Sequence, residues 1–146
     1  MSKIGKPRSS KGLATFCSRI AQDKISHDVL MLDMSEIETA PAEYFVVCTC
    51  ESTVQVQALI NEVHKKCTMF GIDKPNREGH DVGNWVIMDF FDVVLHIMLP
   101  EIRSFYKLEK LWSDAKFMTV TDDGKTRAFK PENLDSIYNP PIEEII

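Results

Sequence analysis

The segment 44–49, Tyr-Phe-Val-Val-Cys-Thr, constrains the fold more than any other part of the chain. It is aromatic or β-branched at almost every position, which is typical of a β-strand. Because successive side chains of a strand point to opposite faces of the sheet, a strand that is apolar on both faces is buried on both faces. The segment therefore predicts a sheet that has helices packed on it.

Helical and strand patterns alternate around this segment. Apolar residues recur at helical spacing over 12–26 and 53–70, and Ser52 and Gly71 stand where the second helix would be capped and ended. Shorter apolar runs predict strands over 29–34, 85–90 and 92–99, and Pro100 can open a last helix over 101–112. The helix 53–70 is a crossover between strands, so we expect at least one parallel, right-handed connection.

These elements predict an α/β fold in which helices cover a mixed β-sheet. We expect a basic N-terminal arm over residues 1–11, one domain over 12–118, and a largely irregular tail over 119–146 with a short strand or helical turn. The stretch 72–83, which holds two glycines and a proline, is expected to be a loop. The strands 85–90 and 92–99 are expected to form a hairpin or a kinked ribbon, and 146 residues fit one domain.

The charge balance restricts the partners. The chain carries 17 Lys and Arg against 22 Asp and Glu, a formal net charge of −5, which argues against bare nucleic acid as the main partner. The central domain is acidic and the arm is basic, which favours encounters with basic partners such as ribosomal proteins. No apolar run approaches the roughly 20 residues of a membrane-spanning helix.

The residues give little support for an enzyme. The four cysteines, at 17, 48, 50 and 67, lack zinc-ribbon spacing and are interpreted as reduced thiols. The chain has no glycine-rich phosphate loop, so we expect no catalytic residue, no metal and no cofactor. Asp89 and Asp92 could hold Mg²⁺ in a nucleotidyltransferase-like enzyme, although the role of turn residues is favoured. His96 is expected to be a half-buried, hydrogen-bonded residue rather than a ligand.

The stretch 101–112 carries three aromatic residues and two leucines among its twelve residues. On a single helix these side chains would cover more than one face. Such a helix is either deeply buried or docks a partner. Composition alone leaves core packing and partner binding both open.

Several stretches together carry a long, ordered motif. They are 32–34 with 42–48, the capped helix from Ser52, 85–89, and the string 92–112, which reads Asp-Val-Val-x-His and ends Arg-x-Phe-Tyr-x-Leu-Glu-x-Leu-Trp. Over about residues 12–116 the chain resembles the ribosomal silencing factors, also called the Iojap family. The order and length of the string make this resemblance far more specific than a lone short motif.

The resemblance implies a translational repressor rather than an enzyme. It implies binding to the large ribosomal subunit through ribosomal protein number fourteen, and a steric block to joining of the small subunit. It also implies a fold like that of nucleotidyltransferases without their active site, and members of the family form homodimers in isolation, which the sequence leaves open for this chain. The short basic arm favours a bacterial cytoplasm over an organelle. Membrane association and sequence-specific nucleic-acid binding are not expected. The alternatives are a nucleotidyltransferase-like enzyme and a large-subunit assembly factor.

The resemblance also implies a set of partner-facing positions. The family's interface tryptophan and tyrosine have matches here, with an apolar residue before the tyrosine and a leucine after it. Three further positions match near the same surface. Exposed aromatic anchors with acids nearby would suit a basic ribosomal protein. In chain order, these expected partner-binding residues are Trp85, His96, Arg103, Phe105, Tyr106, Leu108 and Glu109.

Two departures from the family pattern concern local loops. Phe91 stands where many relatives have glycine, and phenylalanine does not easily take a positive φ. We therefore expect a different turn there, or a ring that fills a local apolar space. Cys50-Glu51-Ser52 keeps the helix cap of the family but loses a glycine turn.

Overall fold

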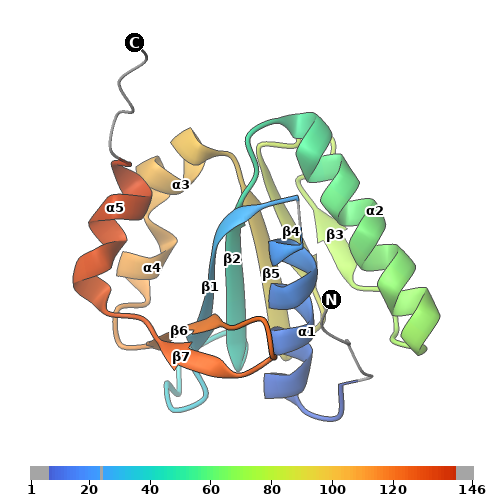
Figure 1. Ribbon diagram of the computed structural model, residues 1–146, viewed down its shortest axis with the longest axis horizontal. Coiled ribbons are helices and arrows are strands. Elements are labelled where there is room, and N and C mark those ends of the chain that lie inside the picture. Colours follow the sequence, from blue (N-terminus) through green and yellow to red (C-terminus); the bar gives the residue numbers. More distant parts are fainter. Residues whose placement is uncertain (1–6, 24, 141–146) are drawn as a thin grey trace.

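The computed structural model describes residues 7–23 and 25–140, and it is built around one seven-stranded sheet (Figure 1). None of its described helices is both long and apolar enough to cross a bilayer. In chain order, the elements are α1 (Ser10–Gln22), β1 (His27–Asp33), β2 (Tyr44–Thr49), α2 (Thr53–Phe70), β3 (Asn76–Glu78), β4 (Trp85–Asp89), β5 (Val93–Met98), α3 (Pro100–Tyr106), α4 (Leu108–Leu111), β6 (Lys116–Val120), β7 (Thr126–Ala128), the 3-10 turn η1 (Pro131–Asn133) and α5 (Leu134–Tyr138).

The sheet is mixed, with the strand order β3-β4-β5-β2-β1-β6-β7. Its central pair, β2 and β5, is parallel and sets Tyr44 opposite Val93 and Thr49 opposite Met98. Its other pairs are antiparallel, including the β4–β5 hairpin. The expected parallel pair, the hairpin and the α/β fold class are confirmed. The predicted likeness to nucleotidyltransferases stays a prediction.

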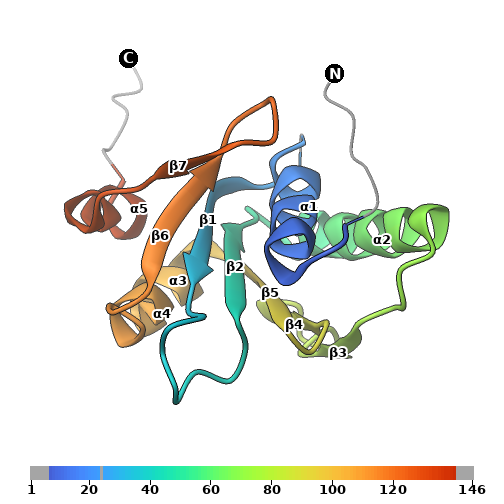
Figure 2. The ribbon, with the colours of Figure 1, turned by 90° about the horizontal axis from the view of Figure 1, so that it is seen from below.

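Helices cover both faces of the sheet. The helices α1 and α2 lie on one face, whereas α3, α4 and α5 lie on the other (Figures 1 and 2). All of β2 is buried: Val46 and Cys48 join the core under α1 and α2, and Phe45 and Val47 join the core under α4 and α5. The prediction made from segment 44–49 is therefore confirmed. All four cysteines are free thiols, as expected, and all four are buried.

The helix α2 begins and ends at the predicted residues. The Ser52 hydroxyl accepts a hydrogen bond from the backbone N–H of Gln55 at 3.2 Å, and the side chain of Gln55 in turn accepts from the backbone N–H of Glu51 at 2.8 Å. This reciprocal pair satisfies N–H groups that a helix start leaves free. Gly71 ends the helix in the left-handed conformation, with φ of 67°. The cap therefore survives the loss of the family's glycine turn.

The last predicted helix is two helices. The expected helix over 101–112 breaks at Lys107, whose φ of 48° is left-handed, so that α3 ends and α4 begins there. In one continuous helix, Arg103 and Glu109 would point about 120° apart around the axis. The break turns Glu109 back toward Arg103, and the two side chains form a buried ion pair. Helical spacing could not reveal a break that a buried charge requires.

The two chain ends also differ from expectation. The first helix starts at Ser10 rather than 12, capped by the Ser9 hydroxyl, and residues 1–6 of the expected arm lie outside the described residues. The boundary expected at 118 falls inside β6, and the stretch expected to be largely irregular continues as β7, η1 and α5. Leu134 and Tyr138 of α5 are buried, so this segment belongs to the core. Its only sequence signal was a short apolar group at helical spacing, Leu134, Ile137 and Tyr138.

Two loops also differ. Residues 76–78 of the expected loop form the edge strand β3 against β4, and all three are exposed, so no apolar pattern marked them. Phe91 does take a positive φ, of 78°, and its side chain is 83% exposed. The expectation that the turn would avoid this conformation, or bury the ring, is wrong. The turn is supported instead by Asp89, whose carboxylate accepts the backbone N–H of Phe91 at 2.7 Å.

The left-handed end of α2 gives a first prediction. The substitution Gly71→Ala places a Cβ in a conformation that costs an L-residue about 1 kcal/mol. We expect the free energy of unfolding in urea to fall by that amount. Gly71→Asn is the matched control and should lose less, because asparagine tolerates this conformation better. An unchanged stability in Gly71→Ala would contradict the assigned cap.

Candidate functional site

Three aromatic side chains gather on the sheet face that carries α3 and α4. Tyr106 stands between the other two, with its ring centroid 5.0 Å from that of Trp85 on β4 and 5.0 Å from that of Phe105 on α3. Phe105 is 77% exposed and Tyr106 54% exposed, while Trp85 is half-buried. We call these three residues the aromatic patch. Clustered exposed aromatic residues are a mark of interaction surfaces.

The patch is exposed because β4 lies beyond the helices on this face. On β4, Val86 and Met88 are buried in the core under α1 and α2. The alternate residues Trp85 and Ile87 are only half-buried, and Asp89 is exposed. A strand covered on one side only shows this alternation. Ile87 therefore extends the apolar surface, a position that sequence reasoning missed although the alternation in 85–89 could have indicated it.

Exposed acidic side chains on β3, β4 and α3 lie near the patch. The register of β3 with β4 sets Glu78 beside Ile87 and Asn76 beside Asp89 on the same face of the sheet. Glu101 is exposed on α3, one helical turn before Phe105. An apolar centre with an acidic rim fits a partner whose own surface is basic.

His96 supports the tryptophan of the patch from inside. The indole Nε1–H of Trp85 donates to Nδ1 of His96 at 3.1 Å, and the His96 ring packs 4.5 Å from the ring of Phe45. His96 is buried, and this burial lowers its pKa from 6.5 to about 4. The ring is therefore neutral at pH 7 and accepts through Nδ1. It orients Trp85 and cannot itself meet a partner.

A buried ion pair holds α3 and α4 on the sheet. Nη2 of Arg103 lies 2.8 Å from Oε2 of Glu109, and its Nε donates to the same oxygen at 2.9 Å. Its Nη1 donates to the carbonyl of Asp28 at 2.6 Å and to the hydroxyl of Thr49 at 2.9 Å. Arg103 and Glu109 are 1% and 0% exposed. The one guanidinium thus joins α3 and α4 to the ends of β1 and β2.

The C-terminal helix completes this network. The phenol of Tyr138 donates to Oε1 of Glu109 at 2.7 Å, and the hydroxyl of Ser104 donates to the carbonyl of Tyr138. Burial, together with the neighbouring carboxylate, raises the pKa of Tyr138. Sequence reasoning missed this role because it treated the segment after 118 as a tail. The helix α5 fixes the position of α3, from which Phe105 and Tyr106 project.

The structure divides the seven expected partner-binding residues into two groups. Trp85, Phe105 and Tyr106 form the aromatic patch at the surface. The other four are buried, so the structure places them behind this surface rather than on it. The buried residues are His96, Arg103, Leu108 and Glu109.

The alternative site at Asp89 and Asp92 gains no support from the geometry. Both residues are exposed, and Asp89 stabilises the hairpin turn as expected of a turn residue. Within residues 7–23 and 25–140, no three His, Cys, Asp or Glu side chains are grouped so that they could hold a metal ion.

Comparisons with known proteins agree on one family. The model of the RsfS family, described as "Ribosomal silencing factor during starvation", matches residues 7–139. The chain is 38% identical over 107 residues to the ribosomal silencing factor RsfS of Bacillus subtilis, covering 73% of this chain and 90% of the relative. A mouse protein named "Mitochondrial assembly of ribosomal large subunit protein 1" is 35% identical over 94 residues, which are 58% of this chain and 40% of that protein. A crystal structure from Chromobacterium violaceum, 35% identical, superposes with a TM-score of 0.67 over 73% of this chain and 88% of that chain.

The buried ion pair gives a second prediction. Glu109→Gln leaves the charge of Arg103 buried without its partner, which typically costs about 3 kcal/mol or more. We expect urea unfolding to show a loss of that size. Combining it with Arg103→Met should cost less than the sum of the two single losses, because the pair is coupled. Additive losses would contradict the assigned ion pair.

The buried histidine gives a third prediction, on pH. Because the folded state keeps the pKa of His96 near 4 and unfolding returns it to 6.5, protonation favours the unfolded state. Its stabilising contribution is complete above pH 6.5 and is lost as the pH falls toward 4. His96→Asn keeps an acceptor for Trp85 but cannot take up this proton. The free energy of unfolding should therefore depend less on pH between 6.5 and 4 in this variant than in the wild type. If the free energy of unfolding depended equally on pH in His96→Asn and in the wild type, a group other than His96 would be responsible for the dependence.

Proposed function

This chain belongs to the RsfS family of ribosomal silencing factors, and from that premise we propose that it represses translation by binding the large ribosomal subunit and blocking subunit joining. In this proposal, the aromatic patch docks on ribosomal protein number fourteen of the large subunit. The protein then acts as a steric obstacle and needs no chemical step. The single observation that carries the proposal is the exposure of Phe105 and Tyr106 on a rigid, buried support.

The chemistry of the patch supports a ribosomal protein as partner. A few residues carry most of the binding energy at a protein interface, and tryptophan and tyrosine are enriched among them, at about 2 kcal/mol or more for a central anchor. The acidic rim formed by Glu78, Asp89 and Glu101 complements a basic surface, and ribosomal proteins are predominantly basic. An interface of standard size, about 1,600 Å² in total, would suffice to hold an obstacle of this size in place.

The same patch supports two further expectations. We expect the patch to join two copies of the chain when no ribosome is present, because removing an exposed apolar surface from water is favourable. The name of the mouse relative favours a second candidate function, the assembly of the large subunit. An assembly factor would use the same docking surface but would bind subunit precursors and would not prevent joining of mature subunits.

Binding and joining assays test the proposal. We expect the wild type to co-sediment with isolated large subunits and to reduce the formation of complete ribosomes when small subunits are added. Tyr106→Ala and Phe105→Ala should each weaken binding roughly 30-fold, the equivalent of about 2 kcal/mol. Because both side chains are exposed, the stability of these variants should stay close to that of the wild type.

Met69→Ala is the matched control, since Met69 is an exposed apolar residue on α2, on the other face of the sheet. It should bind as the wild type does. Equal weakening in Met69→Ala and Tyr106→Ala would contradict the patch as the docking surface. Binding without any effect on subunit joining would favour the assembly function.

A further inference from the structure

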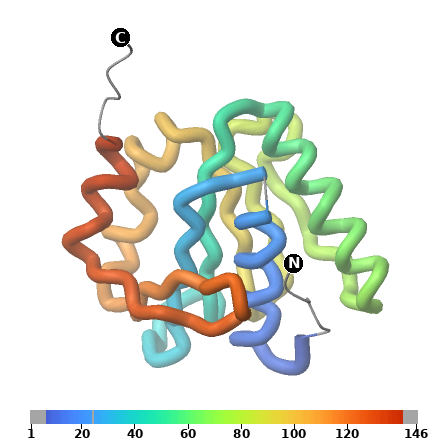
Figure 3. The backbone as a smooth tube through the Cα atoms, in the orientation of Figure 1, coloured from blue at the N-terminus to red at the C-terminus, as the bar shows by residue number. Residues whose placement is uncertain are grey.

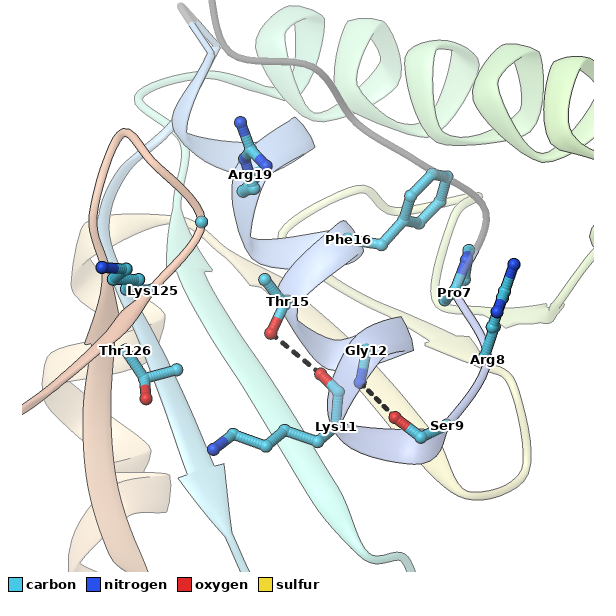
Figure 4. A pocket seen from close by; sticks show the side chains of 11 residues that line it. Pro7, Arg8, Ser9, Lys11, Gly12, Thr15, Phe16, Arg19, Lys125 and Thr126 are labelled. Atoms are coloured by element: carbon cyan, nitrogen blue, oxygen red, sulfur yellow. Dashed lines mark hydrogen bonds between the residues drawn. The ribbon is translucent and has the colours of Figure 1, made fainter.

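A basic cleft lies on the opposite side of the molecule from the aromatic patch. It has a volume of about 640 Å³ and lies between the start of α1 and the turn that joins β6 to β7 (Figure 4). Four of its lining residues, Arg8, Lys11, Arg19 and Lys125, are cationic, and none is acidic. This is a local excess of positive charge in a chain whose formal net charge is −5.

The cleft is assembled by the fold. On α1, Lys11, Thr15 and Arg19 follow one another at four-residue spacing and so share one face of the helix. The β6–β7 turn runs beside this face, with Lys125 and Thr126 across from it (Figures 3 and 4). The turn approaches so closely that a Cβ added to Gly124 would stand 2.9 Å from Nη1 of Arg19.

Part of this charge is left without an acidic partner. Arg19 donates from Nη2 to the carbonyl of Asp122 at 3.3 Å, and the nearby carboxylate of Asp123 accepts from the hydroxyl of Thr121 and from the backbone N–H of Lys125. The ammonium groups of Lys11 and Lys125 form no ion pair with any residue that the structure describes. These two ammonium groups add positive charge to the two sides of the cleft, Lys11 from α1 and Lys125 from the β6–β7 turn.

The spacing of these cations favours a chain of phosphates over a single anion. Lys11 and Arg19 are eight residues apart, which is about 12 Å along a helix. Phosphates of one nucleic-acid strand follow one another every 3.4 Å or so along the helix axis, so this length spans several of them. The aromatic residue of the lining, Phe16, is 2% exposed and offers no ring on which a base could stack. The cleft therefore suits phosphates rather than bases.

We propose that this cleft binds the phosphate backbone of an RNA strand, without sequence preference. The inference rests on the proposed function, because docking on a ribosome places the protein among RNA strands. The helix α1, which lines the cleft, and the helix α3, which carries Phe105 and Tyr106, lie on opposite faces of the sheet (Figure 2). A protein docked through the patch therefore keeps the cleft open to RNA that approaches from the other side.

Fluorescence anisotropy with a labelled 12-nucleotide single-stranded RNA of mixed sequence tests the proposal, using the full chain at low and rising salt. Lys11→Glu combined with Lys125→Glu should weaken binding at least 10-fold. It should also reduce the slope of log K against log salt by about 1.4, or 0.7 for each phosphate that the variant no longer neutralises. The control, Lys65→Glu with Lys130→Glu, changes the net charge equally at two exposed residues outside the cleft and should weaken binding less than 3-fold.

Equal weakening by the two double variants would overturn the proposal, because net charge alone would then explain binding. Displacement of the RNA by inorganic tripolyphosphate at equal phosphate concentration would also overturn it, in favour of a site for a compact anion. Co-sedimentation with large subunits separates this proposal from the proposed function. The cleft variant should still co-sediment, whereas a wild type that binds RNA but not large subunits would contradict the docking function alone.

Discussion

The guanidinium of Arg103 is the point on which the functional side of the molecule depends. A buried charge must be paired, and here the partners of the guanidinium come from Glu109, Thr49 and the carbonyl of Asp28. The need to pair Arg103 explains why the helix breaks at Lys107, because only this break brings Glu109 to Arg103. The helix α3 is thereby fixed to the ends of two central strands, and the exposed rings on it have a rigid base.

The same network explains why the C-terminal segment belongs to the domain. Glu109 has a second carboxylate oxygen, which the phenol of Tyr138 satisfies. Without α5, this oxygen and the apolar faces of α3 and α4 would be open to water, where the ion pair is weaker. The support of the aromatic patch thus extends over more than a hundred residues, from Asp28 to Tyr138. In the proposed functions the patch meets a basic protein, whereas the basic cleft on the other face of the sheet meets RNA.

The sequence predicted those parts of the fold that local chemistry decides. The helix α2 follows from Ser52, Gly71 and the apolar stripe between them, and the double burial of β2 follows from its composition. The seven expected partner-binding residues came from the match to the family motif, and the structure brings three of them together in the aromatic patch. Burial of Arg103 could not be predicted, because a charged residue on a helix is usually exposed.

The backbone conformation of Phe91 could not be predicted from the sequence either. Steric preference predicts that phenylalanine avoids a positive φ, but the hairpin between β4 and β5 imposes this conformation. Long-range pairing therefore overrides local preference at this position. The short edge strand β3 was missed for a related reason. It is defined by its pairing with β4, and its three exposed residues show no apolar alternation.

Site-specific photo-crosslinking on large subunits tests the central claim most directly. A benzophenone side chain in place of Phe105 should crosslink to ribosomal protein number fourteen, and the same group in place of Met69 should not. Attachment of the Phe105 probe to that protein alone is the predicted result. A crosslink to it from Met69, with none from Phe105, would show that the opposite face docks and would contradict the account.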